Sequence, residues 1–306
     1  MAEAPRDPEE LTAAAALAPP TAAIAAGTHM GAVRLTVADL DRSIAYYGDA
    51  LGLAALRRED GSAALGAPGG DRELLLLEEL PGAVPSDGYP GLFHFALVLP
   101  ERVDLARFLA HAVRERVPLV GLSDHFVSEA IYLQDPDHHG IEIYWDRPRA
   151  AWEGQVGERM GTWALDVESL LAELPDPATE PFAGLAAGTV MGHVHLRAAD
   201  IAETIAFYRD ALGLELMAQL GEQAAFLAAG GYHHHIGANV WETRRREPAP
   251  PDTARLLEVT IVLPDAAERD RAVARLDAAG AAPEPVGDAV RVVDPSGIPL
   301  RLDVER

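Results

Sequence analysis

The sequence predicts an α+β fold built from four copies of a strand–helix–strands unit, two in each half of the chain. Residues 37–53 (VADLDRSIAYYGDALGL) and 198–214 (AADIAETIAFYRDALGL) are identical at ten of seventeen positions. Two further pairs match more loosely: GLFHFALVLP at 91–100 with RLLEVTIVLP at 255–264, and DPDHHGIEIYWD at 135–146 with DPSGIPLRLDVE at 294–305. Similarity at a nearly constant spacing indicates an internal repeat.

The first unit of each half is expected to form a short strand and then a helix, with the strands at 32–37 and 193–197. An aspartate that can cap the helix precedes it and a glycine follows it, at Asp39 and Gly52 and again at Asp200 and Gly213. One face of each helix is apolar at helical spacing and is expected in the core. These apolar positions are Ile44, Tyr47 and Leu51 in the first half, and Ile205, Tyr208 and Leu212 in the second.

The second unit of each half is also expected to open with a strand, which a helix and further strands follow. The opening strands are expected at 92–99 and 256–263, and the closing strands at 129–133, 140–145, 289–293 and 298–303. The segment 148–188 joins the halves. Its prolines predict turns, while Trp152, Trp163 and an expected helix at 164–173 indicate that it packs on one domain.

Composition excludes several classes of site and partner. The 306 residues include no Cys, which excludes disulfides, zinc–thiolate sites, iron–sulfur clusters and thiol nucleophiles. The formal net charge of −23 repels nucleic acid and anionic lipid, so neither is an expected partner. No run of ~18 apolar residues exists, so no membrane span is expected. Acidic residues near the start argue against a signal peptide and predict a cytoplasmic protein.

The repeated motif resembles the vicinal-oxygen-chelate superfamily, which includes glyoxalase I, bleomycin-resistance proteins and extradiol dioxygenases. The first copy fits the pattern D-[LI]-x-x-[ST]-[IL]-x-[FY]-Y-x-D-x-L-G-L at 39–53. Within the superfamily, GLFHFALVLP, SDHFVSEAIYLQDPDHHGIEIYWDRPR and GYHHHIGANVW are similar to the two-domain catechol-2,3-dioxygenase group. The resemblance implies four βαβββ modules in two domains. We expect an N-terminal arm of weak order (1–28), a domain of modules one and two (29–147), a linker (148–188) and a domain of modules three and four (189–306).

In this superfamily the metal ligands lie on the first strands of modules and on a final strand. Those positions hold His94, Glu142 and His193 in modules two and three, whereas Ala32, Glu258 and Arg301 occupy the counterparts in modules one and four. The resemblance therefore implies a His94/Glu142/His193 metal site. This set requires modules two and three to share a barrel. The conventional pairing, one with two and three with four, would leave each barrel incomplete unless a second subunit supplied the missing ligands.

The resemblance also implies polar groups beside the metal. Extradiol enzymes carry a His, then a Tyr, then the ligand Glu ten residues after the Tyr, and His125, Tyr132 and Glu142 follow this order. The family's acid–base His lies in a His–x–x–Ala pattern, which His235 fits best. On a strand His233 would share a face with His235, while His234 would point away.

The resemblance implies an Fe(II)-dependent extradiol dioxygenase, with Mn(II) as the alternative metal, that opens a catechol-like ring with O₂. It also favours a homo-oligomer. A hydroquinone-type ring-cleaving dioxygenase or a glyoxalase-like lyase or isomerase is the second interpretation. The third is a metal-free protein that sequesters a small aromatic molecule, and this interpretation predicts no bound iron.

Overall fold

The computed structural model of the chain describes residues 12–13, 20 and 22–305. Most of its strands lie in a ten-stranded and an eight-stranded sheet. In spatial order the first contains β1 (Thr12–Ala13), β13 (Glu215–Leu220), β14 (Ala224–Ala228), β15 (Ile236–Asn239), β12 (Val190–Arg197), β7 (Gly91–Leu99), β10 (Gly140–Asp146), β9 (Ser128–Gln134), β8 (Gly121–Asp124) and β11 (Trp163–Ala164). The second contains β18 (Glu284–Val286), β19 (Ala289–Val293), β20 (Pro299–Val304), β17 (Leu256–Leu263), β2 (His29–Val37), β5 (Leu75–Glu79), β4 (Ser62–Gly66) and β3 (Ala54–Glu59). A short parallel pair joins β6 (Val84–Pro85) to β16 (Thr253–Ala254).

Each large sheet combines one module from each half of the chain. In the ten-stranded sheet, β7 of module two pairs antiparallel with β12 of module three. In the eight-stranded sheet, β2 of module one pairs antiparallel with β17 of module four. Modules two and three therefore share a sheet within a single chain, as the set of expected metal ligands required. The residue boundaries of the two sequence domains stay a prediction.

The helix of the first unit in each half follows the expected capping pattern. The helices of the described chain are α1 (Leu40–Tyr46), which continues as the π-helix η3 (Tyr47–Leu51), α2 (Arg102–Glu115), the 3₁₀ helix η4 (Arg149–Ala151), α3 (Val156–Arg159), α4 (Val167–Leu171), α5 (Ile201–Ile205), which continues as the π-helix η5 (Ala206–Leu212), and α6 (Ala266–Ala278). Asp39 and Asp200 accept backbone N–H bonds at the starts of α1 and α5. Gly52 and Gly213 end η3 and η5 in the left-handed conformation, with φ of 77° and 103°.

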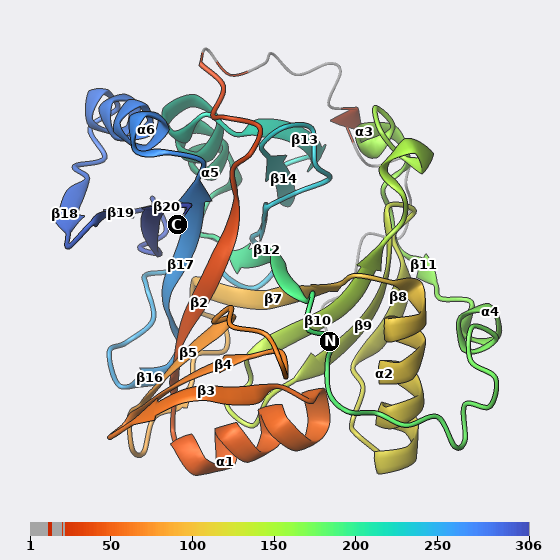
Figure 1. Ribbon diagram of the computed structural model, residues 1–306. Coiled ribbons are helices and arrows are strands. Elements are labelled where there is room, and N and C mark those ends of the chain that lie inside the picture. The colour runs from red at the N-terminus through yellow and green to blue at the C-terminus, as the bar shows by residue number, and fades with distance from the viewer. Residues whose placement is uncertain (1–11, 14–19, 21, 306) are drawn as a thin grey trace.

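A large apolar core draws residues from both sheets. Leu35 and Val259 of the eight-stranded sheet and Phe95 and Val194 of the ten-stranded sheet are fully buried members of it. The helix α2 packs against β10 and β7, and Figure 1 shows α6 beside β17 and β20 at the opposite side of the molecule. This arrangement leaves the face of β7, β10 and β12 away from the helices free to carry polar groups.

Most of the predicted N-terminal arm lies outside the described residues. Its last part, 22–28, packs on module three, where the buried Ile24 donates its backbone N–H to the carbonyl of Gly213. Among the residues that the structure describes, no helix is long and apolar enough to cross a membrane.

The linker packs on the ten-stranded sheet through one of its two tryptophans. Trp152 is buried with Val127, Met160 and Ala218, and its Nε1–H donates to the carbonyl of Arg147. Trp163 instead remains 42% exposed. The helix expected at 164–173 is shorter, because Trp163 and Ala164 form β11 against β8 and α4 begins after the Asp166 cap.

A tyrosine at the same place in both halves ties the helix to the turn between the last two strands of the next module. The hydroxyl of Tyr47 donates to Asp135 Oδ2 over 2.8 Å, and that of Tyr208 donates to Asp294 Oδ2 over 3.1 Å. The other oxygen of Asp135 accepts two backbone N–H groups within the turn. This turn joins β9 to β10 and so sets their relative position.

We predict that Tyr47→Phe lowers the free energy of unfolding by about 1–3 kcal/mol, because a buried carboxylate loses a hydroxyl donor. Urea unfolding followed by circular dichroism measures the change. Tyr46→Phe is the matched control, since its hydroxyl bonds the Gln134 carbonyl at the surface and should cost less than about 1 kcal/mol. Equal losses in the two variants would contradict the account of the turn.

Candidate functional site

Three neighbouring strands bring His94, Glu142 and His193 together. The central strand β7 carries His94 and lies between β10, which carries Glu142, and β12, which carries His193. Ala96 of β7 stands opposite both Glu142 and His193 in the two pairings. Since side chains alternate between faces along a strand, His94 and Ala96 point to the same face. The small alanine leaves space between the flanking side chains.

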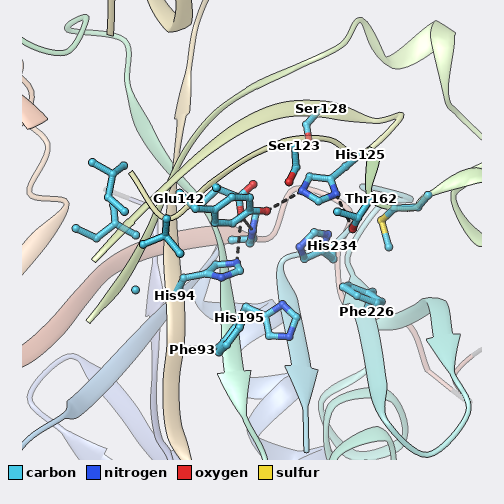
Figure 2. A pocket seen from close by; sticks show the side chains of 18 of the residues that line it. Phe93, His94, Ser123, His125, Ser128, Glu142, Thr162, His195, Phe226 and His234 are labelled. Carbon is cyan, nitrogen blue, oxygen red and sulfur yellow. Dashed lines mark hydrogen bonds and ion pairs between the residues drawn. The ribbon is translucent and has the colours of Figure 1, made fainter. Parts of the chain in front are cut away.

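Both imidazoles approach the same carboxylate oxygen. Nε2 of His94 and Nε2 of His193 each lie 3.1 Å from Oε2 of Glu142, and one donor atom from each of the three residues lies within 4.8 Å of the others. All three side chains are buried. Figure 2 shows His94 and Glu142 at this point, with His195 and His234 beside them.

The electrostatics of this cluster suit a bound cation. Burial alone would raise the pKa of Glu142, but His193 and His94 outweigh it and hold that pKa well below its ordinary value. Burial lowers the pKa of His193 to about 4. An ionised carboxylate and neutral imidazoles are the forms that ligate a metal. Although Nε2 of His94 lies close to the Glu142 carboxylate, it makes no hydrogen bond in the described chain, so the three residues fit a metal ion that would satisfy it.

His125 and Tyr132 form a hydrogen-bonded pair that lines the same pocket. Nδ1 of His125 lies 2.7 Å from the carbonyl of Gly161, and its Nε2 lies 2.7 Å from the hydroxyl of Tyr132. Because a carbonyl only accepts, Nδ1 carries the proton and Nε2 accepts from Tyr132. Burial and the nearby Glu142 raise the pKa of Tyr132 well above its ordinary value, which keeps its hydroxyl protonated.

The histidines at 233–235 lie differently from the sequence expectation. The expectation assumed a strand, but β15 begins only at Ile236, so alternation does not apply to the preceding residues. His234 lines the pocket, and its ring centroid lies 4.1 Å from that of His193. His235 is absent from the pocket lining, and its Nδ1 accepts the backbone N–H of Ala229. His233 is fully buried behind His234.

The pocket in front of these residues has a volume of about 370 Å³. Its walls are largely apolar and include Phe93, Val127, Met160, Phe226 and Trp241. Met160 and its neighbours Gly161 and Thr162 come from the linker, which therefore closes one side of the site. An apolar cavity with a few convergent polar groups is the usual form of a small-molecule site.

Comparison with known proteins agrees with this architecture. The family model of the Glyoxalase/Bleomycin resistance protein/Dioxygenase superfamily matches residues 29–143 and 190–302. The chain belongs to this superfamily. The curated catechol-2,3-dioxygenase of Bacillus subtilis (strain 168) is 42% identical over 273 residues, which cover 88% of this chain and 94% of the relative. The family resemblance expected from the sequence is thus confirmed.

Solved structures confirm the α+β fold of this superfamily member. A putative dioxygenase from Bacillus subtilis subsp. subtilis str. 168 superposes with a TM-score of 0.59 at 16% identity, over 94% of this chain and 86% of that one. Glyoxalase I from Zea mays superposes with a TM-score of 0.53 at 20% identity, over 90% and 92%. At these identities the likeness is one of fold.

Two further histidines line the pocket beyond the set of site residues that the resemblance implies. His195 follows His193 by two residues on β12, shares its face and lines the pocket. Its Nε2 is buried without a hydrogen-bond partner in the described part of the chain, and burial lowers its pKa well below the ordinary value. The pattern His–x–His on a strand was the signal for it. For His234, the signal was the pair Gly230–Gly231, which forms a turn between β14 and β15.

We predict that Glu142→Gln lowers the bound metal more than about tenfold, because the amide keeps the shape but removes the charge. Metal content after anaerobic incubation with Fe(II) and gel filtration, measured by mass spectrometry, tests this. His29→Ala is the control, since His29 pairs with Glu305 outside the pocket. Full metal content in the Gln variant would rule out Glu142 as a ligand.

Proposed function

We propose that this protein is an Fe(II)-dependent extradiol dioxygenase that opens a catechol or a related dihydroxylated aromatic ring with O₂. The observation that carries the proposal is the convergence of His94, Glu142 and His193 at one buried point of an apolar pocket. Two histidines and one carboxylate on one face are the ligands of non-haem Fe(II) oxygenases. The 42% identity to a catechol-2,3-dioxygenase over most of both chains supports the same enzyme class.

His94 and His193 would hold the metal through Nε2, and Glu142 through its carboxylate. When bound, Fe(II) would supply adjacent positions for both substrate oxygens and O₂ and would allow electrons to pass between them. The strands that carry these ligands are bonded to one another over most of their lengths. The ligand positions are therefore set before any substrate arrives.

His234 is the group best placed to move protons. His234 lines the pocket, and burial and the neighbouring His193 lower its pKa well below the ordinary value, which keeps the imidazole neutral. A neutral imidazole can accept a proton from a catechol hydroxyl made more acidic by a bound metal. Tyr132 and His125 stand on the β9 side of the pocket. Because Tyr132 donates to His125, a substrate oxygen that approaches the tyrosine meets a hydroxyl whose orientation is fixed.

The apolar walls bind an aromatic ring and exclude water from it. Phe93, Phe226 and Trp241 offer ring faces and edges, which favour contact with another aromatic ring. Exclusion of water strengthens the electrostatic effects of the polar groups. A dihydroxylated ring matches this pocket, since one edge is polar and the rest is apolar.

The alternative functions would require different ligands or a different substrate. Glyoxalase-type sites usually add a second Glu ligand, and in the described residues the cluster contains only His94, Glu142 and His193. A hydroquinone-type dioxygenase would use the same metal with differently placed hydroxyls. A metal-free binding protein leaves the buried Glu142 charge without a cation, which is costly.

Anaerobic loading with Fe(II), followed by catechol in air, tests the proposal. We expect bound iron and a rise in visible absorbance from the yellow ring-opened product, and Mn(II) loading in parallel distinguishes the two metals. Bound metal without that product from catechol, but with turnover of hydroquinone, would favour the second interpretation. No bound metal and unaltered catechol would refute the dioxygenase assignment.

We predict that His234→Phe lowers kcat about 10²- to 10⁴-fold, the usual contribution of a general acid–base group, while it keeps a ring against His193 and hence the metal. His235→Asn is the matched control, because its amide oxygen can still accept the N–H of Ala229. Steady-state kinetics on iron-loaded protein compare the two. A large loss in His235→Asn alone would return the role to His235.

A further inference from the structure

A chain of hydrogen bonds runs from the pocket histidine into the protein. Nδ1 of His234 lies 2.9 Å from Nδ1 of His233, and Nε2 of His233 lies 2.8 Å from Oδ1 of Asp146. Asp146 is the last residue of β10, the strand that carries Glu142. The order His234, His233, Asp146 thus leads from the pocket wall to the end of a strand that holds a proposed ligand.

The carboxylate of Asp146 is held in place on its other oxygen. Tyr232 donates its hydroxyl to Oδ2 over 2.6 Å. The hydroxyl of Tyr144 lies 2.8 Å from that of Tyr232, and since Tyr232 has given its only proton to Asp146, Tyr144 donates here. Oδ1 therefore remains for His233, and an ionised carboxylate can only accept from it.

These bonds fix the protons on both imidazoles. His233 must carry its proton on Nε2 to donate to Asp146, so its Nδ1 in the neutral form is an acceptor. His234 must then donate from Nδ1, and this leaves its Nε2 without a proton. No described residue forms a hydrogen bond with Nε2 of His234, on the other side of the ring from His233. That nitrogen is left for a molecule in the pocket.

We propose that His233 and Asp146 are positioning residues that hold His234 in the tautomer whose Nε2 accepts a proton from the substrate. This inference rests on the proposed function and assigns roles to two residues that do not line the pocket. The opposite tautomer of His234 would present an N–H to a substrate hydroxyl and could not act as its base. The choice of tautomer therefore decides whether His234 works in the required direction.

The surroundings of His233 match a positioning role. The residue is fully buried and does not line the pocket. The rings of Tyr232 and Trp152 lie against it, with centroids 3.9 and 5.7 Å away. Both of its nitrogens are engaged, so the ring cannot turn over without the loss of two hydrogen bonds. Trp152 belongs to the linker, which therefore helps to hold the chain of bonds.

Asp146→Asn tests the proposal in the iron-loaded full chain with catechol. An amide can donate as well as accept, so it no longer enforces the proton on Nε2 of His233. We expect kcat to fall about 10²-fold or more, with KM and iron content close to those of the wild type. Asp146→Glu, which restores an acceptor-only group, should recover part of kcat. Tyr232→Phe, which removes the donor to the other oxygen and the acceptor of the Tyr144 hydroxyl but leaves the bond from His233, should retain most of it.

A spectroscopic readout separates tautomer control from simple packing. The absorbance of 4-nitrocatechol differs between its singly and doubly ionised forms, so anaerobic binding to each variant reports loss of the second proton. The wild type should bind the doubly ionised form, and Asp146→Asn should bind a less ionised form. If Asp146→Asn loses iron or stability, the comparison of His233→Asn with His233→Leu tests the proposal instead. The amide oxygen introduced by His233→Asn can still accept a hydrogen bond from His234, so this variant should preserve more kcat than His233→Leu.

The outcomes distinguish this inference from the proposed function. If the wild type is active and Asp146→Asn has the same kcat and the same nitrocatechol spectrum, the positioning role is overturned and the dioxygenase assignment stands. Equal losses in Asp146→Asn and Asp146→Glu, or in His233→Asn and His233→Leu, would also overturn it. An inactive, metal-free wild type would refute the proposed function itself.

Discussion

The site depends on one buried carboxylate, Glu142, held between the imidazoles of His94 and His193. A buried negative charge is costly unless a cation or hydrogen bonds compensate it, and two nitrogens at 3.1 Å from one oxygen provide the place for a cation. The strand order around this point brings the compensating groups together. Only with β7 between β10 and β12 do the three side chains meet, so each half of the chain alone holds an incomplete site.

In the eight-stranded sheet, other residues occupy the positions that carry the proposed metal ligands in the ten-stranded sheet. Glu258 and Arg301 occupy the positions of His94 and Glu142 in module four. Arg301 pairs with Asp303 over 3.2 Å, and Glu258 lies 4.0 Å from Arg291. These charged side chains on this sheet thus compensate one another. The two sheets share a repeat and a core, but among the described residues it is the ten-stranded sheet that gathers imidazoles around a buried acid.

Much of the fold could be predicted from the sequence because its signals are local. Aspartate caps, terminal glycines and the buried face with Tyr47 and Tyr208 placed the helices, and apolar runs placed the strands. The pairing of modules two and three in one sheet has no local sequence signal. It was predicted because His94, Glu142 and His193 can form one site only if these modules are neighbours. Sequence reasoning misplaced the segment before Ile236, because Gly230 and Gly231, both at positive φ, form a turn there. In that turn His234, and not His235, reaches the pocket.

Anomalous diffraction at the iron edge, from crystals grown anaerobically with Fe(II) and catechol, tests the central claim most directly. The account predicts one iron bound by His94, Glu142 and His193, with both catechol oxygens on its open side and Nε2 of His234 facing one of them. Iron bound elsewhere, or catechol seated in the pocket without iron at these three residues, would contradict the account.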